Sequence, residues 1–129
     1  MTDGAPNERL QATFRAELQD HMRSMERDVL ALERAAGAPE RAALYASIFR
    51  AVHSLKGAAR VVGEAALEAA CHRLEEQIQR RRDGGEAPSP ALLQALLQAV
   101  DAIRAMEDSE ASRAALVAAA ARVETADAA

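Results

Sequence analysis

Residues 48–63 read IFRAVHSLKGAARVVG and combine an apolar stripe with a polar, reactive face. The apolar members recur at steps of three and four, which is the spacing of one side of a helix. They are Ile48, Val52, Leu55, Ala59 and Val62. His53 and Lys56 lie three residues apart, so they project together from another face of the same helix. The segment therefore predicts a helix that buries one side and presents His53 on another.

Gly57 lies one turn beyond His53, inside this predicted helix. A glycine in the middle of a helix costs about 1 kcal/mol relative to alanine, so its presence calls for a reason. The simplest reason is access, because a position without a side chain lets a partner approach the imidazole closely. We expect the rest of the chain to be a scaffold that presents His53.

The same helical periodicity continues on both sides of this segment, and strand-like alternation is absent from the sequence. It predicts five helices, at about residues 8–36, 39–62, 64–82, 90–107 and 109–124. The terminal segments 1–7 and 125–129 are expected to be disordered. Short connections between long amphipathic helices favour antiparallel neighbours. We therefore predict an all-α single domain over residues 1–129, an up-down antiparallel four-helix bundle with an additional C-terminal helix.

Apolar stripes and start signals support individual helices of this prediction. The stripe of the first helix begins at Leu10. Ser89 is a good N-cap and Pro90 suits the first helical position, so together they mark the start of the fourth helix. In the alanine-rich fifth helix, Leu116 and Val117 are the expected larger apolar contacts.

Composition narrows the class of protein. The chain has 129 residues, half of them hydrophobic, which is enough for one domain with a real core. A formal charge of −4 argues against nucleic-acid binding. A single cysteine, Cys71, excludes an intramolecular disulfide and suits a reducing cytoplasm. No apolar run approaches the ~18 residues that span a membrane, and the N-terminus lacks the order of a signal peptide. We expect a soluble, cytoplasmic protein.

His53 could be a core histidine, a metal ligand, an acid–base catalyst or a nucleophile. On the third predicted helix, His72 and Glu75 are three apart and share a face. If that face meets the second helix, Glu75 can accept a hydrogen bond from Nδ1 of His53 and leave Nε2 unprotonated, with its lone pair outward. Lys56 could then pair with an arriving phosphoryl group. An oriented nucleophile and a nearby cation are what phosphoryl acceptance requires.

These residues also carry a family resemblance. The run from His53 to Gly57, HSLKG, resembles the core motif of histidine-containing phosphotransfer (HPt) domains. With residues 48–52 before it and Gly63 after it, the chain is most similar to the N-terminal (P1) domain of CheA-type chemotaxis histidine kinases. The resemblance covers roughly residues 10–108. It implies that His53 is phosphorylated, that Lys56 assists, and that His72 and Glu75 support the imidazole.

The resemblance also implies partners. The phosphoryl group would come from an ATP-binding histidine kinase domain and pass to an aspartate on the receiver domain of a response regulator. ATP and Mg²⁺ would be used by that separate kinase domain, so we expect this domain to bind no cofactor and no metal. We expect the isolated domain to be a monomer, and the parent chain could be a CheA-type autokinase.

Other interpretations remain beside this one. The main alternative is a non-catalytic helical scaffold in which His53 is incidental. A di-iron site is disfavoured because His72-x-x-Glu75 reverses the usual Glu-x-x-His order and has no second copy. A nucleotide site is disfavoured because the chain has no Walker-type glycine-rich loop. His21 is expected at the surface or its boundary, Cys71 in the core, and residues 80–82, three arginines, at a solvated helix end.

Overall fold

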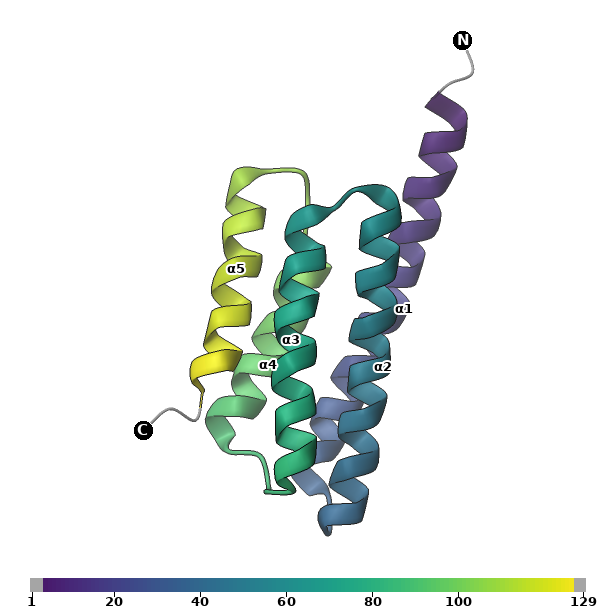
Figure 1. The fold of residues 1–129 in the computed structure, drawn as a ribbon. Helices are drawn as coiled ribbons and strands as arrows, with labels where there is room; N and C mark the ends of the chain where they lie inside the picture. Colours follow the sequence, from purple (N-terminus) through teal and green to yellow (C-terminus); the bar gives the residue numbers. More distant parts are fainter. Residues whose placement is uncertain (1–3, 127–129) are drawn as a thin grey trace.

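The computed structural model describes residues 4–126, with side chains from residue 7, and consists of five helices joined by short connections (Figure 1). The helices are α1 (Gly4–Arg34), α2 (Ala38–Val62), α3 (Ala65–Gly84), α4 (Pro90–Arg104) and α5 (Glu110–Thr125). The described residues contain no strand. Consecutive helices run in opposite directions, which confirms the predicted all-α up-down bundle (Figure 1).

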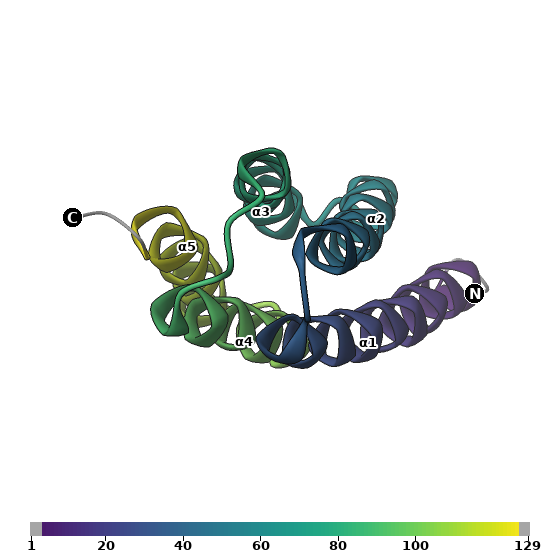
Figure 2. The ribbon, with the colours of Figure 1, turned by 90° about the horizontal axis from the view of Figure 1, so that it is seen from below.

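Seen from one end, the helices form a closed ring (Figure 2). The pairs in extensive contact are α1–α2, α2–α3, α3–α5, α5–α4 and α4–α1. The additional C-terminal helix therefore does not lie outside a finished bundle. It occupies the position between α3 and α4, and it runs parallel to α3 (Figure 1).

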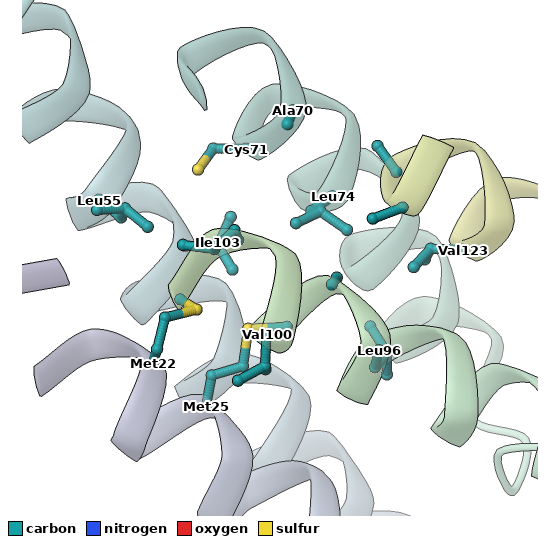
Figure 3. Packing of buried hydrophobic residues seen from close by; sticks show 14 of the residues in the cluster. Met22, Met25, Leu55, Ala70, Cys71, Leu74, Leu96, Val100, Ile103 and Val123 are labelled. Atoms are coloured by element: carbon teal, nitrogen blue, oxygen red, sulfur yellow. The ribbon is translucent and has the colours of Figure 1, made fainter. Parts of the chain in front are cut away.

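Most apolar positions of the predicted stripes form one continuous core. Each of the five helices sends side chains into it, as Figure 3 shows with Met22 and Met25 from α1, Leu55 from α2, and Val123 from α5. None of the described helices is long and apolar enough to cross a membrane.

Two of the expected core positions are wrong. Leu10 is exposed because it belongs to the N-terminal turns of α1, which project past the other helices (Figure 1). Val117 is 55% exposed, whereas its neighbour Leu116 is 1% exposed. The inward side of α5 is built instead from Leu116, Ala119, Ala120 and Val123.

Helix boundaries also differ from the prediction by a few residues. Residues 4–7 were expected to be disordered, yet they form the first turn of α1, where Pro6 is tolerated because N–H groups there have no helical partner. Thr125 likewise belongs to α5, whereas α4 ends at Arg104, before the predicted residue 107. The expected disorder of residues 1–3 and 127–129 falls outside the described residues.

Candidate functional site

The turn between α2 and α3 determines which faces of these two helices meet. Gly63 has a left-handed backbone (φ 77°), and its N–H donates to the carbonyl of Arg60. The N–H of Glu64 donates to the carbonyl of Ala59 at 2.9 Å, which completes a glycine-closed helix end. Glycine adopts this conformation without the strain that a side chain would bring. The chain reverses here, so α3 runs back along α2 and its inner face meets the turns that carry His53.

At this interface, the structure brings His53, Lys56 and Glu75 together. Nδ1 of His53 lies 2.6 Å from Oε2 of Glu75. Nζ of Lys56 forms an ion pair with Oε1 of the same carboxylate. The two oxygens of Glu75 thus hold one group each from α2. The Glu75 side chain is only 8% exposed, whereas that of His53 is 61% exposed.

The electrostatics of Glu75 decide the protonation pattern of the imidazole. Burial raises the pKa of the Glu75 carboxyl, but hydrogen bonds from Lys56 and His53 and their charges outweigh it, so the pKa lies below its usual value. Glu75 is therefore ionised at neutral pH and can only accept hydrogen bonds. Nδ1 of His53 must be the donor, which leaves Nε2 of the neutral ring with its lone pair. The exposed ring offers that nitrogen to an incoming group.

Phe49 is a neighbour of the site that sequence reasoning did not single out. Its ring stacks on the His53 imidazole with a centroid distance of 5.8 Å and an interplanar angle of 9°. The signal was available in the sequence, because an aromatic residue four positions before a histidine lies on the same helical face. In the sequence analysis Phe49 entered only within residues 48–52, as part of the family resemblance.

Gly57 lies on the exposed surface of α2, one turn beyond His53. A Cβ built at this position would meet no atom within 4 Å. The fold of this chain therefore gives no packing reason for a glycine here. The role of Gly57 in access stays a prediction.

His72 lies on α3 but does not join the cluster. Its Nε2 is 3.0 Å from Oε1 of Glu76, and both side chains are exposed. In the described part of the chain, His72 makes no polar contact with His53, Lys56 or Glu75. The support of the imidazole by His72 stays a prediction.

Cys71 and His21 were the other residues considered in the sequence, and we assign neither a part in the chemistry. Cys71 is fully buried, and burial together with the nearby Glu75 charge raises the pKa of its thiol to about 12. His21 is half-buried on α1.

Within residues 4–126 there is no group of three or more His, Cys, Asp or Glu side chains placed to hold a metal. A surface groove of about 680 Å³ lies beside Leu32, Pro88 and Leu97, and His53 does not line it.

His53 therefore lies on the exposed face of a helix and not in an enclosed cavity. Such a site can bind and position little by itself, since small-molecule sites are usually concave. It suits a reaction in which a second protein brings the rest of the active site.

Comparisons with known proteins identify a matching family and a similar solved structure. A family model described as the Hpt domain matches residues 9–106. Among solved structures, the chain is similar to the phosphorylated P1 domain of CheA3 from R. sphaeroides, determined in complex with CheY6. The two chains share 30% identity with a TM-score of 0.68, over 89% of this chain and 98% of the other. No curated protein matches the sequence.

Proposed function

The chain belongs to the Hpt domain family, and on this basis we propose that Nε2 of His53 is the atom that carries the phosphoryl group. The protein is a histidine phosphotransfer domain of a two-component signalling system. The observation that carries the assignment of His53 is the 2.6 Å contact between its Nδ1 and buried Glu75, on a ring that is otherwise exposed. An exposed surface histidine would not need a buried carboxylate, whereas a nucleophile with a fixed tautomer does.

Phosphoryl acceptance can proceed at His53 without a proton transfer. The lone pair of Nε2 attacks the γ-phosphorus of ATP, the N–P bond forms, and the P–O bond to ADP breaks with its electrons left on ADP. Nδ1 keeps its proton, so the ring gains positive charge as the bond forms. Glu75 lies against that proton and stabilises the developing charge, as a buried carboxylate does beside a catalytic imidazole.

Lys56 supplies the cation of the site. Its ammonium group is held by Glu75 one turn from His53 and remains partly exposed. We assign it the role of pairing with the phosphoryl oxygens, where positive charge stabilises the transferring group. His72 lies one turn from Glu75 on α3. We propose that its imidazole releases Glu76 and binds the incoming phosphoryl group from the edge of the site.

The second half of the reaction transfers the phosphoryl group to a response regulator. A carboxylate oxygen of a receiver aspartate attacks phosphorus, the N–P bond breaks, and its electron pair returns to Nε2. The similar CheA3 domain was determined with CheY6, and we propose a receiver domain of this kind as the partner here. Gly57 leaves room for that partner beside His53.

The first partner is a histidine kinase catalytic domain. It binds ATP and Mg²⁺, and we propose that the present domain needs no cofactor of its own, because its part of the reaction is carried by His53, Lys56 and Glu75. We further propose that the isolated domain is monomeric and acts in the cytoplasm, where ATP is available to the kinase. Sedimentation of the purified domain and fractionation of cells test these two points.

Phosphate incorporation tests the proposed function. The domain is mixed with γ-labelled ATP and a CheA-type kinase core, and His53→Gln is compared with His21→Gln and His72→Gln, which cover all three histidines of the chain. We expect acid-labile, alkali-stable label that only His53→Gln abolishes, with its helical circular dichroism unchanged. His72→Gln should accept label more slowly, and His21→Gln should behave as the parent. Label that survives in His53→Gln would refute the assignment and favour a scaffold role.

A further inference from the structure

We propose that Phe49 is a positioning residue for the phosphoacceptor. Its ring lies along one face of the His53 imidazole and fixes the plane of that ring, and with it the direction in which the Nε2 lone pair meets phosphorus. This inference rests on the proposed role of His53. It adds a residue that acts through His53 and does not itself touch the transferring group.

The stack has the geometry of a favourable aromatic pair. A centroid distance of 5.8 Å and an interplanar angle of 9° fall in the range of offset-stacked rings. Side chains of a helix lean toward its N-terminus, so the His53 ring extends over the turn that carries Phe49. Phe49 is half-buried and packs against the hydrophobic core. The surface on which the imidazole rests is therefore anchored to the fold.

The hydrogen bond to Glu75 alone would leave the ring incompletely fixed. One contact at Nδ1 sets the distance to the carboxylate, but small coupled changes of the two side-chain torsions of His53 can still rotate the ring while that contact is kept. The Nε2 lone pair lies in the ring plane, so this rotation would change the direction of attack. Parallel stacking on Phe49 restrains it. The two contacts together define the direction from which phosphorus must arrive, and small misalignments of a reacting atom slow a reaction steeply.

Phe49 and Gly57 make the surroundings of His53 asymmetric. They lie one turn before and one turn after His53 on the same face of α2. On the first side an aromatic ring stacks on the imidazole in an offset arrangement, and on the second even a Cβ would meet no atom within 4 Å. A longer side chain at position 57 would lean back toward His53 by the same helical geometry. The open side therefore leaves room for the body of a phosphoryl donor or acceptor, whose phosphorus meets Nε2 in the plane of the ring.

The experiment compares three variants of the domain. Phe49→Leu keeps an apolar side chain on the core but removes the flat ring, and Phe49→Tyr restores the ring. Leu93→Ala is the matched control, because Leu93 is also half-buried against the core but belongs to α4, which makes no extensive contact with α2. Each is measured for the single-turnover rate of phosphoryl acceptance, thermal unfolding, and order of the His53 Cε1–H bond by carbon relaxation.

We expect Phe49→Leu to accept phosphate about tenfold more slowly, with lower order of the His53 ring. Phe49→Tyr should stay within about twofold of the parent in rate and retain the order, because the stacking surface is present. Leu93→Ala should lose thermal stability but keep both the rate and the order.

Two results would overturn the inference. One is a Phe49→Leu variant with the parental rate and ring order. The other is an equal loss of rate in Phe49→Leu and Leu93→Ala, which would assign the effect to stability. Failure of the proposed function itself gives a different signature, since His53→Gln would then retain label whatever the behaviour of Phe49.

Discussion

Glu75 is the residue on which the chemistry of the site depends. A buried carboxylate is costly unless it is paired, and here each oxygen has a partner, His53 at Oε2 and Lys56 at Oε1. The same contacts that make the burial tolerable also fix the tautomer of His53 and hold the ammonium group beside it. Stability and function therefore share one side chain.

Glu75→Gln should lower the free energy of unfolding by about 1–3 kcal/mol at neutral pH, because it removes the charge that both donors face. It should also slow phosphoryl acceptance. The pKa of Glu75 is lowered in the folded protein, so its contribution is fully present above the ordinary value of 4.5. The contribution is lost as the pH falls through the lowered pKa. Urea unfolding from neutral pH to about pH 3 should show the parent and variant converging in stability.

The neighbouring Glu76→Gln is the matched control for this prediction. Glu76 is exposed and pairs with exposed His72, so its replacement should change stability by less than about 0.5 kcal/mol at any pH. A difference between the parent and Glu75→Gln that stays constant down to the lowest pH would contradict the lowered pKa.

Sequence spacing indicated that Glu75 could contact His53 if the second and third helices met on that face. It did not predict which partners His72 and Lys56 would have. A spacing of three places His72 and Glu75 on one helical face, yet this leaves them about 60° apart around the helix axis. That rotation is enough to put Glu75 at the buried interface and His72 in solvent beside Glu76. Lys56 was expected to pair with an arriving phosphoryl group, and that role stays a prediction. Its contact with Glu75 was not predicted, because it depends on the distance between the two helices.

At the scale of elements, α5 is the helix whose place the sequence left most open. Five helices and their order follow from periodicity and from caps such as Ser89, whose hydroxyl accepts from the N–H of Leu92 at 3.1 Å. In α5, however, alanine is the commonest residue, so the apolar face is weakly marked. Leu116 and Val117 are adjacent and cannot both face inward. Only packing between α3 and α4 decides in favour of Leu116.

This arrangement predicts opposite outcomes for the two adjacent residues. Leu116→Ala removes a fully buried side chain and should cost about 2–5 kcal/mol of unfolding free energy. Val117→Ala removes an exposed β-branched residue from a helix, so it should be neutral or stabilising by less than about 0.5 kcal/mol. Urea unfolding followed by helical circular dichroism measures both. Equal effects would mean that α5 lies outside the bundle and does not complete its ring.

At the scale of the whole molecule, the site and the hydrophobic core belong to one structural unit. The helices that carry His53 and Glu75 also enclose the core. Cys71 points into this core from α3, in the same region as Leu55 and Ile103 (Figure 3). It lies one turn before Glu75 on α3. Any motion that exposes the thiol must therefore also separate α3 from its neighbours and disturb the contact between Glu75 and His53.

The rate at which the Cys71 thiol reacts therefore measures how cooperatively the whole domain unfolds. Its thiol is buried and its pKa is about 12, so the reactive thiolate is scarce in the native state and out of reach of reagents. We expect a disulfide reagent at neutral pH to label it only through global unfolding, with a rate that follows the unfolding equilibrium. Leu116→Ala should raise that rate by about thirtyfold or more, in line with its loss of stability, and Val117→Ala should leave it unchanged. Labelling that ignores both Leu116→Ala and added denaturant would reveal local opening at α3. In that case the phosphoacceptor would be held by a part of the bundle that opens independently of the rest.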